Sequence, residues 1–311
     1  MTRAPDWRTY AALAGGVLVV STASILVRFA QSQGVPSLAI AAWRLTLAAM
    51  LIAPWVLGGQ RRELAALSRR DWLLAALSGL FLAAHFATWI VSLDYTSVAS
   101  SVALVTTNPV WIALFSVLVL RERMAAVRVL AVGLSLAGSG LVLWADADAA
   151  SAAAPDPMLG NALALAGSLA VCGYFLIGRR LRAHMSVLAY IGVVYVVAAL
   201  CLMLLALAVG VRMAGYSYFA WMVLAAMALG PQLLGHGAFN YALKHVSATM
   251  IALAVLGEPV GATVLAWLMF GEDVGPLKLF GMSLLLGGIF LAARSEGDSQ
   301  KARGKQAVPG G

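Results

Sequence analysis

Several polar side chains stand inside segments of this sequence that are otherwise apolar. Gln232, His236 and Asn240 are spaced four residues apart, which places them on one face of an α-helix. Glu258 lies in a second apolar run and Arg44 in a third. Two charges of opposite sign together with amide and imidazole groups are suited to hold a small polar solute by hydrogen bonds and ion pairs. The same side chains could also bond only to neighbouring helices.

Other apolar segments also contain hydrogen-bonding and aromatic side chains. Together with the residues above, we expect the following to contact a solute in a central cavity: His85, Trp89, Thr107, Asn108, Trp111, Gln232, His236, Asn240 and Glu258. Arg44 either extends outward to the membrane surface or faces this cavity, where its planar donor group suits a carboxylate. The carboxylate would be that of the solute or of Glu258. Glu258 could instead carry a proton, meet the ammonium group of the solute, or pair with His236.

Two prolines are expected to shape the cavity wall or to act as hinges. A proline inside a helix removes one hydrogen bond and frees the carbonyl four residues earlier. Pro109 would free the carbonyl of Val105, and Pro259 that of Val255. Free carbonyls are tolerated inside a membrane where they face protein or a water-filled cavity.

The sequence contains no pattern that predicts a metal centre, a cofactor or a catalytic site. Its four histidines are scattered, and Cys172 and Cys201 lie singly in apolar segments. No phosphate-binding glycine loop followed by Lys and Ser or Thr is present. Residues 137–140 fall one glycine short of an intramembrane serine motif, so an enzyme is only the less favoured alternative.

The composition determines which elements must carry these residues. Hydrophobic residues make up 62% of the 311 residues and charged residues 11%, against about 25% charged in soluble domains. This excludes a soluble enzyme and predicts an all-α polytopic membrane protein. Ten apolar segments are long enough to span a bilayer: 9–29, 37–57, 72–93, 97–120, 125–144, 158–178, 187–209, 217–243, 247–270 and 277–293.

The loops predict the orientation of these segments. The chain has 21 Lys and Arg residues and a net charge of +8. With the N-terminus in the cytoplasm, most of these basic residues fall on cytoplasmic loops and tails. This distribution follows the positive-inside rule. We therefore expect both termini in the cytoplasm, a bacterial inner (plasma) membrane as the location, a basic tail that faces the membrane, and no nucleic-acid partner.

The two halves of the chain resemble one another. At a shift of 150 residues, Pro109 matches Pro259 and Gly138 matches Gly288. Five segments per half is an odd number, so the second half would enter the membrane from the opposite side. Such inverted repeats are typical of secondary transporters with a site near the bilayer midplane. The predicted organisation is a cytoplasmic N-terminus (1–8), a first five-helix repeat (9–144), an external linker (145–157), a second repeat (158–293) and a cytoplasmic tail (294–311).

Several local motifs carry a family resemblance. Residues 42–45 (AWRL), 87–97 (ATWIVSLDYTS) and 256–260 (LGEPV), together with the two repeated prolines, resemble the drug/metabolite transporter superfamily in its EamA form. The resemblance covers roughly residues 10–293. It implies ten helices around a central cavity and a secondary transporter, with bacterial amino-acid exporters of the YddG type among the members.

The resemblance and the residues together predict export of amino acids, aromatic and other neutral ones, or related metabolites, by alternating access. A nucleobase, a sugar derivative or a cation remains open as the solute. So does the oligomeric state, a monomer or a homodimer. Asn108 occupies the position in the first half that Glu258 occupies in the second, so the two halves differ chemically.

Overall fold

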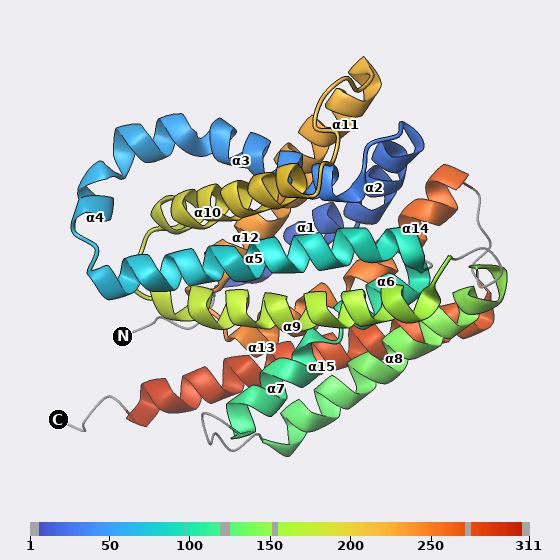
Figure 1. Ribbon diagram of the computed structural model, residues 1–311. Coiled ribbons are helices and arrows are strands. Elements are labelled where there is room, and N and C mark those ends of the chain that lie inside the picture. The colour runs from blue at the N-terminus through green and yellow to red at the C-terminus, as the bar shows by residue number, and fades with distance from the viewer. Residues whose placement is uncertain (1–5, 97, 119–124, 151–154, 271–274, 307–311) are drawn as a thin grey trace.

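The computed structural model describes residues 6–96, 98–118, 125–150, 155–270 and 275–306, and these residues form helices and connecting turns without a strand. Figure 1 shows the helices as an elongated bundle. In order they are α1 (Trp7–Val20), α2 (Ala23–Ser32), α3 (Ser37–Gly59), α4 (Arg61–Ala65), α5 (Arg69–Tyr95), α6 (Val98–Val105), α7 (Asn108–Leu118), α8 (Ala126–Ala150), α9 (Pro157–Leu181), α10 (Val187–Ala208), α11 (Tyr218–Met227), the π-helix η1 (Ala228–His236), α12 (Gly237–Ala242), α13 (Ala248–Val255), α14 (Glu258–Phe270) and α15 (Pro276–Gln306).

Short polar residues mark where many of these helices begin. The side chains of Asp6, Ser68, Ser186 and Ser247 each accept a hydrogen bond from a backbone N–H in the first turn that follows. Such caps satisfy amide groups that have no partner within the helix. The bond from the N–H of Thr9 also lowers the pKa of the Asp6 carboxyl below its ordinary value.

The apolar segments predicted from the sequence fall on these helices. Among the described residues, six helices are long and apolar enough to cross a membrane: 7–32 (α1 with α2), α3, α5, α9, α10 and 218–242 (α11 to α12). Large apolar side chains such as Trp55, Leu204 and Phe290 are exposed on the outside of the bundle. A bilayer is the solvent that such a surface requires. The number of crossings stays a prediction.

Two contacts between α8 and α15 repeat across the halves. A Cβ atom added to Gly138 would meet backbone atoms of Gly281 and Leu285. One added to Gly288 would meet Ala131 and Ser135, which are the same positions shifted by 150 residues. Each helix thus contacts the other through the same pair of repeat positions, which is the pattern produced by a two-fold operation. The structure therefore relates its two halves in the way that the internal repeat of the sequence predicts.

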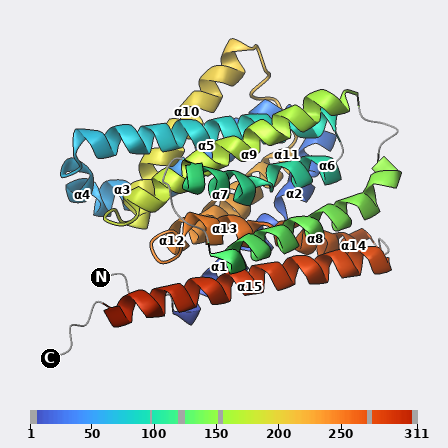
Figure 2. The same cartoon turned by 90° about the horizontal axis from the view of Figure 1, so that it is seen from below.

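A second pair of helix contacts follows the same relation. Gly167 on α9 lies against His85, Thr88 and Trp89 of α5. Gly16 on α1, which precedes Gly167 by 151 positions, lies against Gly235, Ala238 and Phe239, which are His85, Thr88 and Trp89 shifted by 150. Figure 2 shows α5 beside α9 and α8 beside α15, each pair combining one helix from each half.

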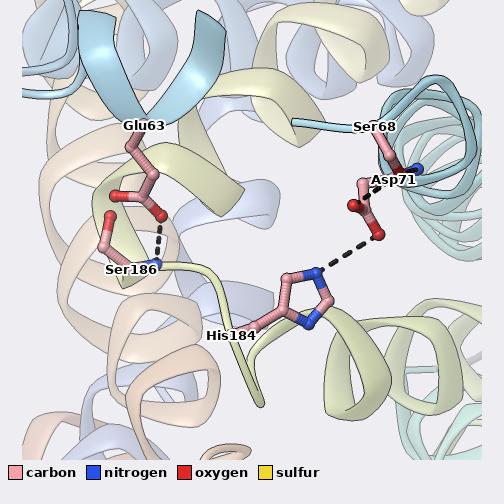
Figure 3. A network of polar contacts seen from close by, with 5 residues as sticks. All are labelled: Glu63, Ser68, Asp71, His184 and Ser186. Atoms are coloured by element: carbon pink, nitrogen blue, oxygen red, sulfur yellow. Dashed lines mark hydrogen bonds and ion pairs between the residues drawn. The ribbon is translucent and has the colours of Figure 1, made fainter. Parts of the chain in front are cut away.

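Polar contacts also join the halves at the end of the bundle where α4 lies (Figure 3). A carboxylate oxygen of Glu63 accepts a hydrogen bond from the backbone N–H of Ser186 at 2.6 Å. Nε2 of His184 lies 3.2 Å from Oδ1 of Asp71, and the hydroxyl of Ser68 donates to Oδ2 of the same carboxylate. These contacts fix the turn between α9 and α10 against α4 and the first turn of α5.

The α8–α15 crossing predicts a glycine requirement. We expect Gly138→Ala to lower the free energy of unfolding by about 1–3 kcal/mol, because the methyl group would overlap backbone atoms of α15. Gly140→Ala on the same helix meets nothing within 4 Å and should be neutral or slightly stabilising. Thermal unfolding of the purified protein in detergent compares the two. Equal midpoints for both variants would contradict the close crossing.

Candidate functional site

A cavity lies in the interior where helices from both halves meet. Its polar lining is formed by Arg44, His85, Trp89, Thr106, Asn108, His236 and Glu258, and its apolar lining by Val20, Val105, Val171, Phe175, Phe239 and Val255. The cavity has a volume of about 30 Å³, enough for about two water molecules. A solute of amino-acid size therefore needs the surrounding helices to move apart.

Two interrupted helices bring one polar residue from each half to this cavity. The helix pair α6 and α7 breaks at residues 106–107, and the pair α13 and α14 breaks at 256–257, again 150 positions apart. Asn108 and Glu258 are the first residues after these breaks and are 2% and 6% exposed. A break at membrane depth is tolerated where the backbone is buried in protein or lines a cavity.

The two prolines stand directly after the breaks. Pro109 and Pro259 are the second residues of α7 and α14. Amide groups in the first turn of a helix have no partner within that helix, so a proline, which has no amide hydrogen, loses no hydrogen bond there. Val105 and Val255, whose carbonyls lie four residues before the prolines, are the last residues of α6 and α13 and line the cavity. The prolines thus begin new helices here and do not bend continuous ones.

Arg44 on α3 is buried completely, at 0% exposure, and does not extend to the bundle surface. Its Nε donates a hydrogen bond to Oε1 of Gln232 at 2.8 Å, and its Cζ lies 4.2 Å from the centroid of the Phe86 ring. Nη1 and Nη2 have no hydrogen-bond partner among the described residues. The guanidinium group therefore keeps two free donor atoms at the cavity wall.

Glu258 faces the same cavity from the opposite repeat. No ion pair within 4.0 Å joins its carboxylate to Arg44, although both residues line the cavity. The two side chains therefore line one cavity more than 4.0 Å apart. A carboxylate at this depth requires a positively charged partner, a bound proton or water.

Two histidines and a tryptophan complete the polar wall. Nδ1 of His85 donates to the backbone carbonyl of Gly167 at 2.9 Å, since a carbonyl can only accept. The His85 ring stacks on Trp89, with centroids 6.0 Å apart and planes 9° apart. Nε1 of Trp89, Nδ1 of His236 and Oδ1 of Asn108 have no hydrogen-bond partner within the described ranges. Unpaired buried polar atoms are rare. Of the ten found among the described residues, five belong to residues that line this cavity, which makes it the candidate binding site.

Other predicted residues lie beside the cavity and bond to their neighbours. Nε1 of Trp111 donates to Oγ1 of Thr107 at 3.2 Å, and that hydroxyl lies 3.1 Å from Oγ of Ser168. Oδ1 of Asn240 accepts from the hydroxyl of Tyr174 at 2.8 Å. These side chains brace α7 and α12 against α9, and in this conformation they are not among the residues that line the cavity.

Gln232, His236 and Asn240 lie in or next to a π-helix and have different contacts. The π-helix runs from Ala228 to His236 and contains Pro231. Gln232 bonds to Arg44 of α3, His236 lines the cavity, and Asn240 accepts a hydrogen bond from Tyr174 of α9. A shared helix face therefore does not give the three side chains a shared partner.

The sequence reasoning missed the aromatic residues Phe86, Phe175 and Phe239. Phe86 supports Arg44, and the other two line the cavity. The repeat held a signal for two of them, because at a shift of 150 Phe239 is the counterpart of Trp89 and Phe86 is that of His236. Phe175 has no such signal.

Fold and site together define a polytopic helical membrane protein with a polar cavity between two related halves. Comparison with known families gives the same result. The profile of the EamA-like transporter family matches residues 7–144 and again residues 158–294. The chain therefore belongs to the EamA-like transporter family, whose members are membrane transporters of small solutes.

Two further comparisons concern individual proteins. No curated protein matches the sequence. Among solved structures, one described as a crystal structure of a protein matches with a TM-score of 0.75 and 19% identity, over 94% of this chain and 98% of that one. At this identity the likeness shows the fold alone.

The position of the two prolines predicts a mild effect of their removal. We expect Pro109→Ala and Pro259→Ala each to change the free energy of unfolding by less than about 1 kcal/mol, because no interior helix hydrogen bond is missing at the start of α7 or α14. Thermal unfolding in detergent measures this. A gain of about 3 kcal/mol, the usual cost of a proline in a helix interior, would show that each break is imposed by its proline.

Proposed function

We propose that the protein exports amino acids, aromatic and other neutral ones, or closely related zwitterionic metabolites across a bacterial inner membrane by alternating access. The observation that carries the proposal is the pair of opposite charges on one cavity. Arg44 offers two Nη atoms, and Glu258 offers a carboxylate. Within the part of the chain that the structure describes, the Nη atoms have no hydrogen-bond partner and the carboxylate forms no ion pair.

An α-amino acid matches this pair in charge. Its carboxylate would receive hydrogen bonds from Arg44, whose planar group suits two oxygens at once. Its ammonium group would lie against Glu258. Both charges of the solute would thereby be compensated in a medium where an unpaired charge is costly. A nucleobase or a sugar would leave both protein charges unmatched, and a simple cation would leave Arg44 unmatched.

The remaining walls suit an apolar or aromatic side chain. Trp89, Phe175 and Phe239 line the cavity, and the indole N–H of Trp89 and the amide oxygen of Asn108 add polar contacts. Aromatic rings attract one another edge to face or in offset stacks. We therefore place Trp89, Asn108, His85 and His236 in the solute site together with Arg44 and Glu258.

The two-fold relation of the halves supports alternating access. A cavity with room for only about two water molecules must open to admit a solute. Halves that can exchange conformations open it on one side at a time. The excess of Lys and Arg on the loops between α3 and α5 and at the end of α9 supports a cytoplasmic location for that end of the bundle.

Uptake by proteoliposomes tests the proposal. We expect saturable uptake of labelled phenylalanine, threonine or methionine that unlabelled amino acids compete. Arg44→Lys should raise the half-saturation concentration about tenfold, because an ammonium group keeps the charge but loses the paired donors. Folding of the variant is checked by gel filtration. Absence of uptake above that of empty liposomes, with folded and inserted wild-type protein, would contradict the amino-acid substrate.

A second variant tests the acidic partner. We expect Glu258→Gln to reduce uptake of phenylalanine at least tenfold while the thermal midpoint in detergent remains close to that of the wild type, because the amide cannot compensate an ammonium charge. Glu63→Gln is the matched control, since Glu63 lies outside the cavity and bonds to Ser186. Wild-type uptake by the Glu258 variant would remove this residue from the site.

A further inference from the structure

The hydrogen bond between Arg44 and Gln232 divides the guanidinium group into two edges. Nε is occupied by the amide oxygen of Gln232 at 2.8 Å, while Nη1 and Nη2 remain without a partner among the described residues. A guanidinium can receive a carboxylate side-on through Nε and one Nη, or end-on through both Nη atoms. With Nε occupied, only the end-on arrangement keeps both bonds.

Other contacts hold this pair in place. The Phe86 ring supports one face of the guanidinium, with 4.2 Å between Cζ and the ring centroid. The hydroxyl of Tyr195 donates to the backbone carbonyl of Gln232 at 3.2 Å. Arg44, Phe86, Tyr195 and Gln232 are all completely buried, at 0% exposure. Close packing leaves the guanidinium little freedom to turn its Nε edge toward the cavity.

We propose that Gln232 is a positioning residue. It holds Nε of Arg44 so that the two Nη atoms face the cavity and receive the carboxylate of the solute end-on. Gln232 itself is not among the residues that line the cavity in this conformation. The inference rests on the proposed function in one respect, namely that the solute carries a carboxylate.

A neutral amide suits this role better than a carboxylate. Glutamate at position 232 would also accept the bond from Nε, but it would cancel the charge of Arg44 and so weaken its attraction for a second anion. The counterpart of Gln232 in the first half is Leu82, which is buried at 0% exposure and cannot form such a bond. The bond between Arg44 and position 232 therefore has no counterpart at the repeat position, Leu82, and the cavity is chemically asymmetric.

Two variants at one position separate positioning from packing. Gln232→Glu keeps the size and the hydrogen bond but removes the net charge, and Gln232→Leu removes the bond. We expect each to raise the half-saturation concentration for labelled phenylalanine about tenfold, with little change in the maximal rate. Tyr190→Phe is the control, because it deletes a buried hydrogen bond to Ser78 without touching Arg44.

Competition by two related compounds provides a readout that a structural defect would not change. Phenylalanine and phenylalaninamide share the ring and the amino group, but only phenylalanine has the carboxylate. We expect both Gln232 variants to reduce the advantage of phenylalanine as an inhibitor about fivefold or more. A damaged fold would weaken both inhibitors equally, and that result, or a wild-type ratio in both variants, would overturn the proposal.

Nuclear magnetic resonance of protein labelled with ¹⁵N-arginine tests the hydrogen bond without any solute. We expect one Nε–H signal that is protected from exchange, present in the wild type and Tyr190→Phe, and lost in Gln232→Leu and Arg44→Lys. Its presence in Gln232→Leu would overturn the positioning role even if transport of amino acids is established. Its loss together with absence of phenylalanine uptake by the wild type would support the positioning role and reject the proposed solute.

Discussion

The structure depends on the burial of one positive charge. Arg44 lies at 0% exposure in the interior of the bundle, where a guanidinium without acceptors is costly. The amide oxygen of Gln232 and the face of the Phe86 ring compensate it only in part, which leaves two donor atoms for a further partner. The membrane-spanning helices satisfy their own backbone groups, so in the proposed function these two donor atoms are available to the solute.

The repeat builds the cavity, and departures from the repeat give it chemistry. Both halves break a helix at the same position and offer the following residue, yet one offers Asn108 and the other Glu258. The counterpart of His85 is Gly235, and that of His236 is Phe86. A strictly symmetric cavity would hold equal groups on both sides. This one places its carboxylate in the second half and its guanidinium in the first.

The sequence predicted the all-helical fold and the EamA family, because apolar length and a few local motifs are sufficient for both. It also pointed to Arg44 and Glu258, since charges within apolar segments are rare. It did not predict that Gln232 lies behind Arg44 and that Asn240 bonds to Tyr174. Those contacts depend on which side chains α3 and α9 bring against this segment, and no residue pattern within one segment contains that information. Trp111 donates a hydrogen bond to the hydroxyl of Thr107, and only the structure shows that the two side chains lie side by side next to α9.

The same contacts limit how the cavity can open in the proposed transport cycle. The pairs α8 with α15 and α5 with α9 each join the two halves through glycines that lie directly against the facing helix. The halves therefore cannot separate as two rigid blocks without losing these contacts. The breaks at residues 106–107 and 256–257 lack a continuous hydrogen-bond ladder and stand at the cavity wall. Rotation of α6 against α7, or of α13 against α14, would open the cavity at one end while the glycine contacts are kept. Because Asn108 and Glu258 begin the helices after these breaks, such a rotation would also move the groups that hold the solute.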